Sequence, residues 1–303
     1  MKGQKARVLT LAEKCKNILA SNWKGNLNTI KADSQGSKQD IYASRVKYLI
    51  KKGKPYIWVP EKDLHNVNTV IDERASFGVA SHFPGPLANL LRSMKQFPAR
   101  VALTGEVMVL RDEKAHLAIE SLRETVISEQ KTLVESSYAV SGILNSSTFG
   151  STSRCENLLE VFNSDENYVV YKLNISSCVF IDGNGGTHEV DLQELEISKA
   201  DKLSPFSAKL IDGINQSAIR RRALMIFCLV YLNTYAKDAY ILWVDRKGFD
   251  VLGKVASSGG EFHWKEIRFT FKEEACDVES FCHQLVEMEE EALKNVKSYS
   301  GLG

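Results

Sequence analysis

The stretch Gly25–Ile30, GNLNTI, opens the series of strands that decides the fold. Residues 41–50 alternate in polarity and are rich in β-formers, which predicts a second strand. The segment Lys51–Lys54 has the composition of a turn around its glycine. Pro55–Pro60, PYIWVP, follows with side chains that suit a pleated sheet. We therefore predict three strands within residues 25–60.

A helix precedes these strands, and helices and strands alternate after them. Residues 9–20 carry an apolar stripe at helical spacing, with Thr10 as a candidate N-cap. Gly105 suggests a bulge or a close backbone approach within its strand, and Gly183–Gly186 suits a tight hairpin. Further helices are expected at Leu64–Ile71, Leu87–Met94 and Glu113–Val126 (capped by Asp112), and further strands at Ser76–Ser81, Arg100–Leu110 and Tyr168–Ile181.

The second half of the chain predicts helix, three-stranded meander, helix. Ser204-Pro205 fits a helix start, and the apolar period then continues, with one break, to about Tyr235. Asp277 is the expected cap of a last helix. The predicted strands of the meander are Ala239–Val244, Phe249–Val255 and Phe262–Phe271. Residues 126–162 give no clear pattern, apart from a Ser/Thr-rich loop at 145–153.

Composition points to an ordinary globular protein. The chain has 303 residues, 44% hydrophobic and 25% charged, enough for about two domains. A net charge of +1 gives no reason to expect nucleic acid as a partner, and no apolar run approaches the ~20 residues of a membrane span. Residues 1–60 hold 13 Lys or Arg against three acids. This excess is either a solvated face or a docking surface for an anionic cofactor or an acidic partner.

The six cysteines form no C-x-x-C pair and no cluster with zinc spacing, so free thiols in a reducing compartment are expected. The sequence shows no G-x-S-x-G, Walker loop, H-E-x-x-H, or G-x-G-x-x-G after a strand. No signal or transit peptide is visible. Spacing alone therefore identifies no catalytic centre.

The order of the N-terminal motifs resembles the FMN-binding split barrel of the pyridoxamine-phosphate-oxidase family. The C-terminal half resembles the small domain called DUF2470, through the segments Val244–Asp250, Ile267–Phe271 and Leu285–Met288. The two together resemble the plan of HugZ-type haem oxygenases and of the plant glutamyl-tRNA-reductase-binding family. The matching N-terminal residues are Gly25, Leu27, Thr29, Ser44, Val46, Tyr48, Gly53, Pro55, Tyr56, Ile57, Leu64, His65, Asn68 and 99–107.

This resemblance implies an α+β fold, with a split β-barrel in residues 1–200 and an α-β-β-β-α domain in residues 201–303. It also implies a homodimer, a chloroplast location and a link to haem or another tetrapyrrole. Haem-degrading relatives carry Ile-Asn-x-Asp-His, whereas this chain has Ile214–Ala218, INQSA. Ser217 and Ala218 replace the acid and the histidine, and alanine cannot bind iron.

We therefore expect a noncatalytic protein that binds a protein partner of tetrapyrrole metabolism, a tetrapyrrole, or both. A HugZ-type haem oxygenase is the first alternative, and an FMN-dependent oxidoreductase is the second. Haem is accordingly a possible cofactor, with FMN ranked after it.

Six residues are candidates for the cofactor site, and two histidines for haem iron. His65 and His82 could bind iron, although His65 could equally bond to backbone beside the barrel. Guanidinium groups bind phosphate or propionate by paired hydrogen bonds. Strand alternation decides whether the arginines face a cleft or water. The candidate cofactor-binding residues are Ser44, Arg45, His65, Asn68, Arg100 and Thr104.

Overall fold

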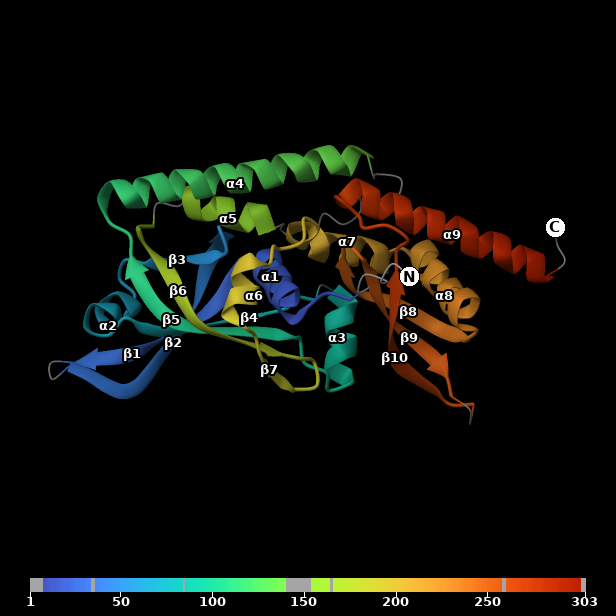
Figure 1. Ribbon diagram of the computed structural model, residues 1–303, viewed down its shortest axis with the longest axis horizontal. Coiled ribbons are helices and arrows are strands. Elements are labelled where there is room, and N and C mark those ends of the chain that lie inside the picture. The colour runs from blue at the N-terminus through green and yellow to red at the C-terminus, as the bar shows by residue number, and fades with distance from the viewer. Residues whose placement is uncertain are drawn as a thin grey trace.

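The computed structural model of the chain describes residues 8–33, 36–83, 85–139, 154–163, 166–257 and 260–300. These residues form a mixed α+β structure, with a closed six-stranded antiparallel barrel followed by a three-stranded antiparallel sheet (Figure 1). The predicted fold class is confirmed. None of the helices within these ranges is both long and apolar enough to cross a membrane.

The barrel strands are β1 (Lys24–Asp33), β2 (Gly36–Lys51), β3 (Lys54–Pro60), β4 (Arg74–Ala80), β5 (Arg100–Val109) and β6 (Tyr168–Ile181). Their order is β3-β2-β1-β4-β5-β6, and β3 pairs with β6 to close the barrel. The short β7 (Thr187–Glu189) extends the sheet beyond β6. Lys52 and Gly53 have φ angles of 48° and 75°, typical of a two-residue hairpin, so the predicted turn is confirmed.

The barrel core is filled by alternate strand residues, together with one face of α1 (Leu11–Ser21). Thr10 caps α1 through a reciprocal capping box with Glu13, as predicted. Gly105 lies at a register shift between β5 and β6, and a side chain there would overlap the carbonyl of Asn174. The predicted bulge and close approach are both present.

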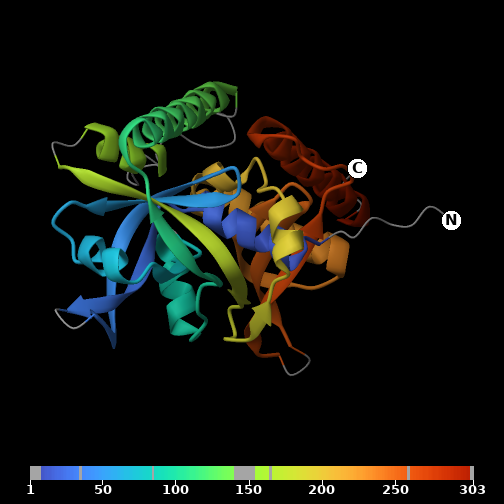
Figure 2. The same cartoon turned by 60° about the vertical axis from the view of Figure 1, so that its left-hand side comes forward.

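The two described helices that reach into the segment without a clear pattern cover one side of the barrel. The helix expected to end near Val126 continues to Ala139, so α4 is Asp112–Ala139, and α5 is Arg154–Asn163. The predicted end was wrong, because beyond Val126 the helix depends on contacts between distant segments: Glu129 pairs with Arg154, and Leu133 packs against the core of the C-terminal half. The loop expected at 145–153 lies outside the described residues. Figures 1 and 2 both show α4 and α5 together on one side of the barrel.

The remaining short helices connect the strands of the barrel domain. They are α2 (His65–Ile71), α3 (Gly85–Ser93) and α6 (Leu192–Ile197). The small domain contains η1 (Ser204–Phe206), α7 (Ser207–Gln216), α8 (Ala218–Leu232), β8 (Ala236–Asp245), β9 (Gly248–Ala256), β10 (Phe262–Thr270) and α9 (Val278–Ser300). The predicted break lies at Ser217, which caps α8, and Asp277 accepts a hydrogen bond from the backbone N of Ser280 at the start of α9 (2.8 Å).

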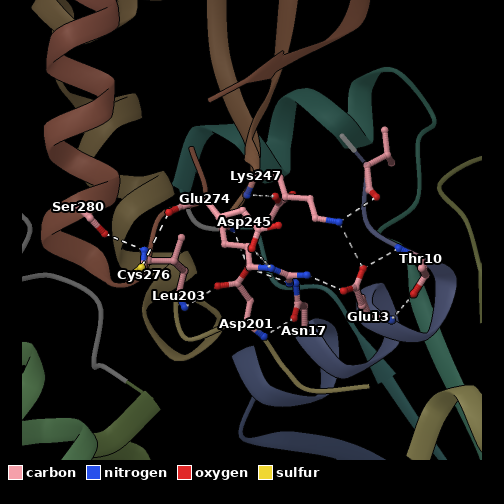
Figure 3. Close-up of polar contacts among 12 residues, drawn as sticks. Thr10, Glu13, Asn17, Asp201, Leu203, Asp245, Lys247, Glu274, Cys276 and Ser280 are labelled. Carbon is pink, nitrogen blue, oxygen red and sulfur yellow. Dashed lines mark hydrogen bonds and ion pairs between the residues drawn. The ribbon is translucent and has the colours of Figure 1, made fainter. Parts of the chain in front are cut away.

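A polar joint connects α1 to the β8–β9 turn (Figure 3). The guanidinium of Arg246 donates to Glu13 (2.5 Å), and its backbone N donates to Asp201 (2.6 Å). The backbone N of Asp201 in turn donates to the Asn17 side chain (2.7 Å). Both ribbon views place α1 between the barrel and the small sheet. The joint therefore fixes the small sheet against the barrel.

Candidate functional site

Strand alternation separates the predicted site residues into two groups on opposite sides of the barrel wall. Ser44 points inward, where it meets His65 from α2, whereas its neighbour Arg45 points outward and is exposed. Arg100 and Thr104 are also exposed on the outer side of β5. The candidates thus do not form one site.

The inner group is a closed hydrogen-bond network. His65 is fully buried, with Nδ1 2.8 Å from the Thr29 hydroxyl and Nε2 3.0 Å from the Ser44 hydroxyl. The Asn68 amide donates to the Thr29 hydroxyl (2.9 Å) and accepts from the backbone N of Ala32 (3.0 Å). This network fixes α2 over one end of the barrel.

The chemistry of this network does not fit a metal ligand. Burial lowers the pKa of His65, against a smaller opposing effect of Asp63, so the ring is neutral at neutral pH. A neutral ring has one donor nitrogen and one acceptor nitrogen, and here each is engaged by a hydroxyl. As arranged, His65 has no nitrogen available for iron, and its contacts are those of a structural residue.

His82 lies in the opposite setting, exposed in the segment after β4. Partial desolvation and the nearby Lys24 lower its pKa, which keeps the imidazole neutral and able to bind a metal at neutral pH. Within the described ranges, no three His, Cys, Asp or Glu side chains gather into a metal-binding group. An iron atom at His82 would therefore have one protein ligand.

The outer group lies on one continuous face of the sheet. Arg45 is opposite Asn26 on β1, Asn26 is opposite Gly78 on β4, and Gly78 is opposite Ala102 on β5. Ala102 is therefore three strand spacings from Arg45. Arg100 is two residues from Ala102 along β5, so it shares the face with Arg45 at a backbone distance of roughly 16 Å. No ion pair links either guanidinium to another described residue.

Small, uncharged side chains lie between and beside these arginines. They are exposed or partly exposed at Asn26, Asn28, Ser76, Gly78, Ala102, Thr104 and Ser177. Thr104 and Ser177 hydrogen-bond to each other across β5 and β6. Lys24 and Lys47 add positive charge along the β1–β2 edge of the same face. We name this set of residues, with Arg45 and Arg100, the outer barrel face.

Three partners in and around the inner network escape sequence-based prediction: Thr29, Tyr42 and Tyr171. The Tyr42 ring lies 4.7 Å from the His65 ring, and the Tyr171 hydroxyl donates to Asn66 on α2 (2.9 Å). Thr29 could have been found, since it lies two residues after the buried Leu27 and so shares its face. Nothing local in the sequence reveals Tyr171, because it comes from a strand more than a hundred residues away.

No family model and no curated protein matches the chain. Among solved structures, a heme binding protein from Mycobacterium smegmatis is similar over 95% of this chain and 99% of that one, with 19% identity and a TM-score of 0.55. The likeness to ChuZ from Campylobacter jejuni (9% identity, TM-score 0.40) covers 62% of this chain and 63% of ChuZ. The likeness to a FAD-binding protein from Mesorhizobium loti (14% identity, TM-score 0.33) covers 56% of this chain and 92% of that protein.

The first of these likenesses establishes the fold, and it extends over the small domain as well as the barrel. The chain is therefore a split-barrel protein with a C-terminal α/β domain.

Proposed function

We propose that this protein is a noncatalytic binding protein of haem or tetrapyrrole metabolism, and that it uses the outer barrel face to bind a tetrapyrrole, a protein partner or both. The observation that carries the proposal is the exposed pair Arg45 and Arg100 on one face of small polar side chains and lysines, without acidic partners among the described residues. The M. smegmatis structure of the same architecture is of a heme binding protein, which supports the choice of ligand.

The residues on this face fit part of a haem. Arg45 and Arg100 would bind its propionates by charge-assisted hydrogen bonds, and His82, which follows β4 beside Arg100, would supply an imidazole to the iron. Bound haem would supply redox and oxygen chemistry. The chain itself contributes binding and orientation of the carboxylates. The small side chains of the face also suit a second copy of the chain, and we include a homodimer in the proposal.

The stretch that matches the haem-degrading motif has structural contacts here. The Asn215 side chain donates to the carbonyl of Ile241 (2.9 Å) and accepts from its backbone N (2.7 Å), which fixes α7 to β8. Ser217 caps α8, a task that aspartate performs equally well, and Ala218 offers no ligand atom. Because Ala218 cannot bind iron, we propose binding rather than haem cleavage. The DUF2470-like segments and the likeness to plant proteins add a plastid location to the proposal.

Haemin titration of the full chain tests the proposal. A saturable change in the Soret band is expected, with affinity reduced about tenfold by Arg45→Ala or Arg100→Ala, since each removes a charge-assisted contact. Arg74→Ala is the matched control, because Arg74 lies at the far end of β4 and is already paired with Asp72. Its affinity should stay within about twofold.

If the Soret band of haemin is the same with and without the protein, tetrapyrrole binding is refuted. A protein partner then remains as the ligand of the outer barrel face. Equal losses in all three variants would place haemin elsewhere on the protein. His82→Ala should change the position of the Soret band if His82 binds the iron, with little effect on the propionate contacts.

A further inference from the structure

A cavity of about 270 Å³ lies where the barrel meets the small sheet. Its walls come from α1, from the segments that flank α3, from the β6–β7 turn and from all three strands of the small sheet. The volume suits a ligand of about ten non-hydrogen atoms, near the lower limit of small-molecule sites. The cavity is inside the junction of the two domains, so it is distinct from the outer barrel face.

A β-bulge shapes the apolar side of this cavity. The register of β8 against β9 shifts between Ile241 and Trp243, and both Leu242 and Trp243 line the cavity. In a regular strand these two successive side chains would point to opposite faces. The paired hydrogen bonds from Asn215 to Ile241 support the strand directly before the bulge. Bulges of this kind often re-aim side chains at binding sites.

An unpaired hydroxyl also lines the cavity. Ser81 is 6% exposed, and its Oγ has no hydrogen-bond partner among the described residues. Buried hydroxyls are normally paired, so this one calls for a polar group within the cavity.

The charge of the cavity is mainly negative. Trp243, Asp250 and Arg268 form one cross-strand row, and Arg268 is shared between Asp245 (2.8 Å) and Asp250 (3.4 Å). The single positive charge of Arg268 is thus shared by two carboxylates. Burial raises the pKa of Asp250 to about 6. The positive charge of Arg268 opposes this rise, and the negative charges of Glu266 and Asp245 add to it. The cavity is also lined by the acids Glu266 and Asp182 and by the single base Lys14.

We propose that this cavity binds a small aromatic amine, with the ring against Trp243 and Phe180 and the ammonium group at Asp250 and Ser81. Ammonium donates to both a carboxylate and a hydroxyl, and it supplies the positive charge that the acids lack. Aromatic walls add cation–π attraction to the apolar contact. Because the polar joint holds the two domains together, the cavity is pre-formed and little ordering is needed on binding.

Calorimetric titration of the full chain with three matched probes tests this proposal. The probes are 2-phenylethylamine, 2-phenylethanol and 3-phenylpropionate, which share a ring and differ in charge. Saturable binding is expected for the amine, weaker binding for the alcohol, and binding weaker by at least about tenfold for the carboxylate. Quenching of the Trp243 fluorescence should follow the same curve and disappear in Trp243→Phe.

Two substitutions locate the contact. Asp250→Asn should weaken amine binding about tenfold, and Ser81→Ala about threefold, as expected for a charged and a neutral hydrogen bond. Asp238→Asn is the control, since Asp238 lies in the same sheet with a similar exposure and pairs with Arg221 away from the cavity.

The proposal is overturned if no probe binds, if amine and carboxylate bind equally, or if Asp250→Asn and Ser81→Ala bind the amine as the native chain does. Arg45→Ala should leave amine binding unchanged. Failure of haemin to bind and failure of the amine to bind are therefore separate results.

Discussion

The inner network and the outer barrel face are only one residue apart in the sequence, yet they have opposite properties. Ser44 points into the barrel and bonds to a fully buried histidine, whereas Arg45 points outward with its guanidinium unpaired among the described residues. All the hydrogen-bonding capacity of the His65 ring is used within the protein. On the outer face, charged groups remain available. Strand phase, more than residue type, therefore separates the structural residues from the proposed binding residues here.

The largest expected effect is the loss of the inner network in His65→Ala. The substitution opens a cavity and removes the hydrogen bonds of His65 to the buried Thr29 hydroxyl and the half-buried Ser44 hydroxyl, so we expect a loss of about 3 kcal/mol in the free energy of unfolding. Urea unfolding measures it. His82→Ala is the matched control and should change stability by less than about 0.5 kcal/mol, because His82 is exposed.

Comparable losses for the two histidines would show that the inner network is not a structural element. In that case His65 would again be a candidate for the cofactor site.

The outer barrel face can be tested by filling it. Gly78 lies at its centre, and a Cβ there would meet no atom within 4 Å, so Gly78→Trp should leave the folded monomer intact. If two copies pair through this face, the bulky ring should raise the dimer dissociation constant by at least about 100-fold, or roughly 2.7 kcal/mol. Sedimentation velocity measures this. Gly185→Trp, in the exposed β6–β7 turn, is unsuitable as a control because its φ is 89°.

Lys265→Trp is a better control, since Lys265 is an exposed residue of β10 in the small sheet, on a different sheet from the face. A native chain that sediments as a monomer at high concentration would contradict the homodimer directly.

Much of the fold could be predicted because it depends on residues that are close together in the sequence. The cap at Thr10, the turn at Gly53 and the close approach at Gly105 each depend on a few neighbouring residues. The continuation of α4 to Ala139 could not be predicted, because beyond Val126 the helix is stabilised by the ion pair of Glu129 with Arg154 and by packing of Leu133 against the core of the small domain.

The candidate site was less predictable than the fold. Candidate residues could be selected by type, but the side of the sheet on which each lies depends on the strand register. A shift of one residue moves every side chain of a strand to the opposite face. His65 and Asn68 are inside, and Arg45 and Arg100 are outside. The cavity between the domains was not predicted, since it depends on a bulge at Leu242 and on contacts between distant segments.

The smallest expected effect is the pH dependence of the inner network. Burial holds the pKa of His65 below its value in the unfolded chain, about 6.5 for a free histidine. Below that pH the unfolded state binds a proton that the folded state does not, so stability should fall as the pH falls, with a slope of at most about 1.4 kcal/mol per pH unit. Asp250, whose pKa is raised to about 6, contributes the opposite slope over the range between its unfolded and folded pKa values.

The difference between the native chain and His65→Gln separates these contributions, because Asp250 titrates in both proteins. Urea unfolding between about pH 7.5 and pH 5 should show the native chain losing stability relative to His65→Gln as the pH falls through the unfolded histidine pKa. A constant difference across that range would mean that the folded protein protonates His65 as readily as the unfolded chain does. The His65 ring would then be in contact with solvent or with a proton acceptor. The inner network would in that case be less shielded from solvent, and so more like the outer barrel face, than its hydrogen bonds indicate.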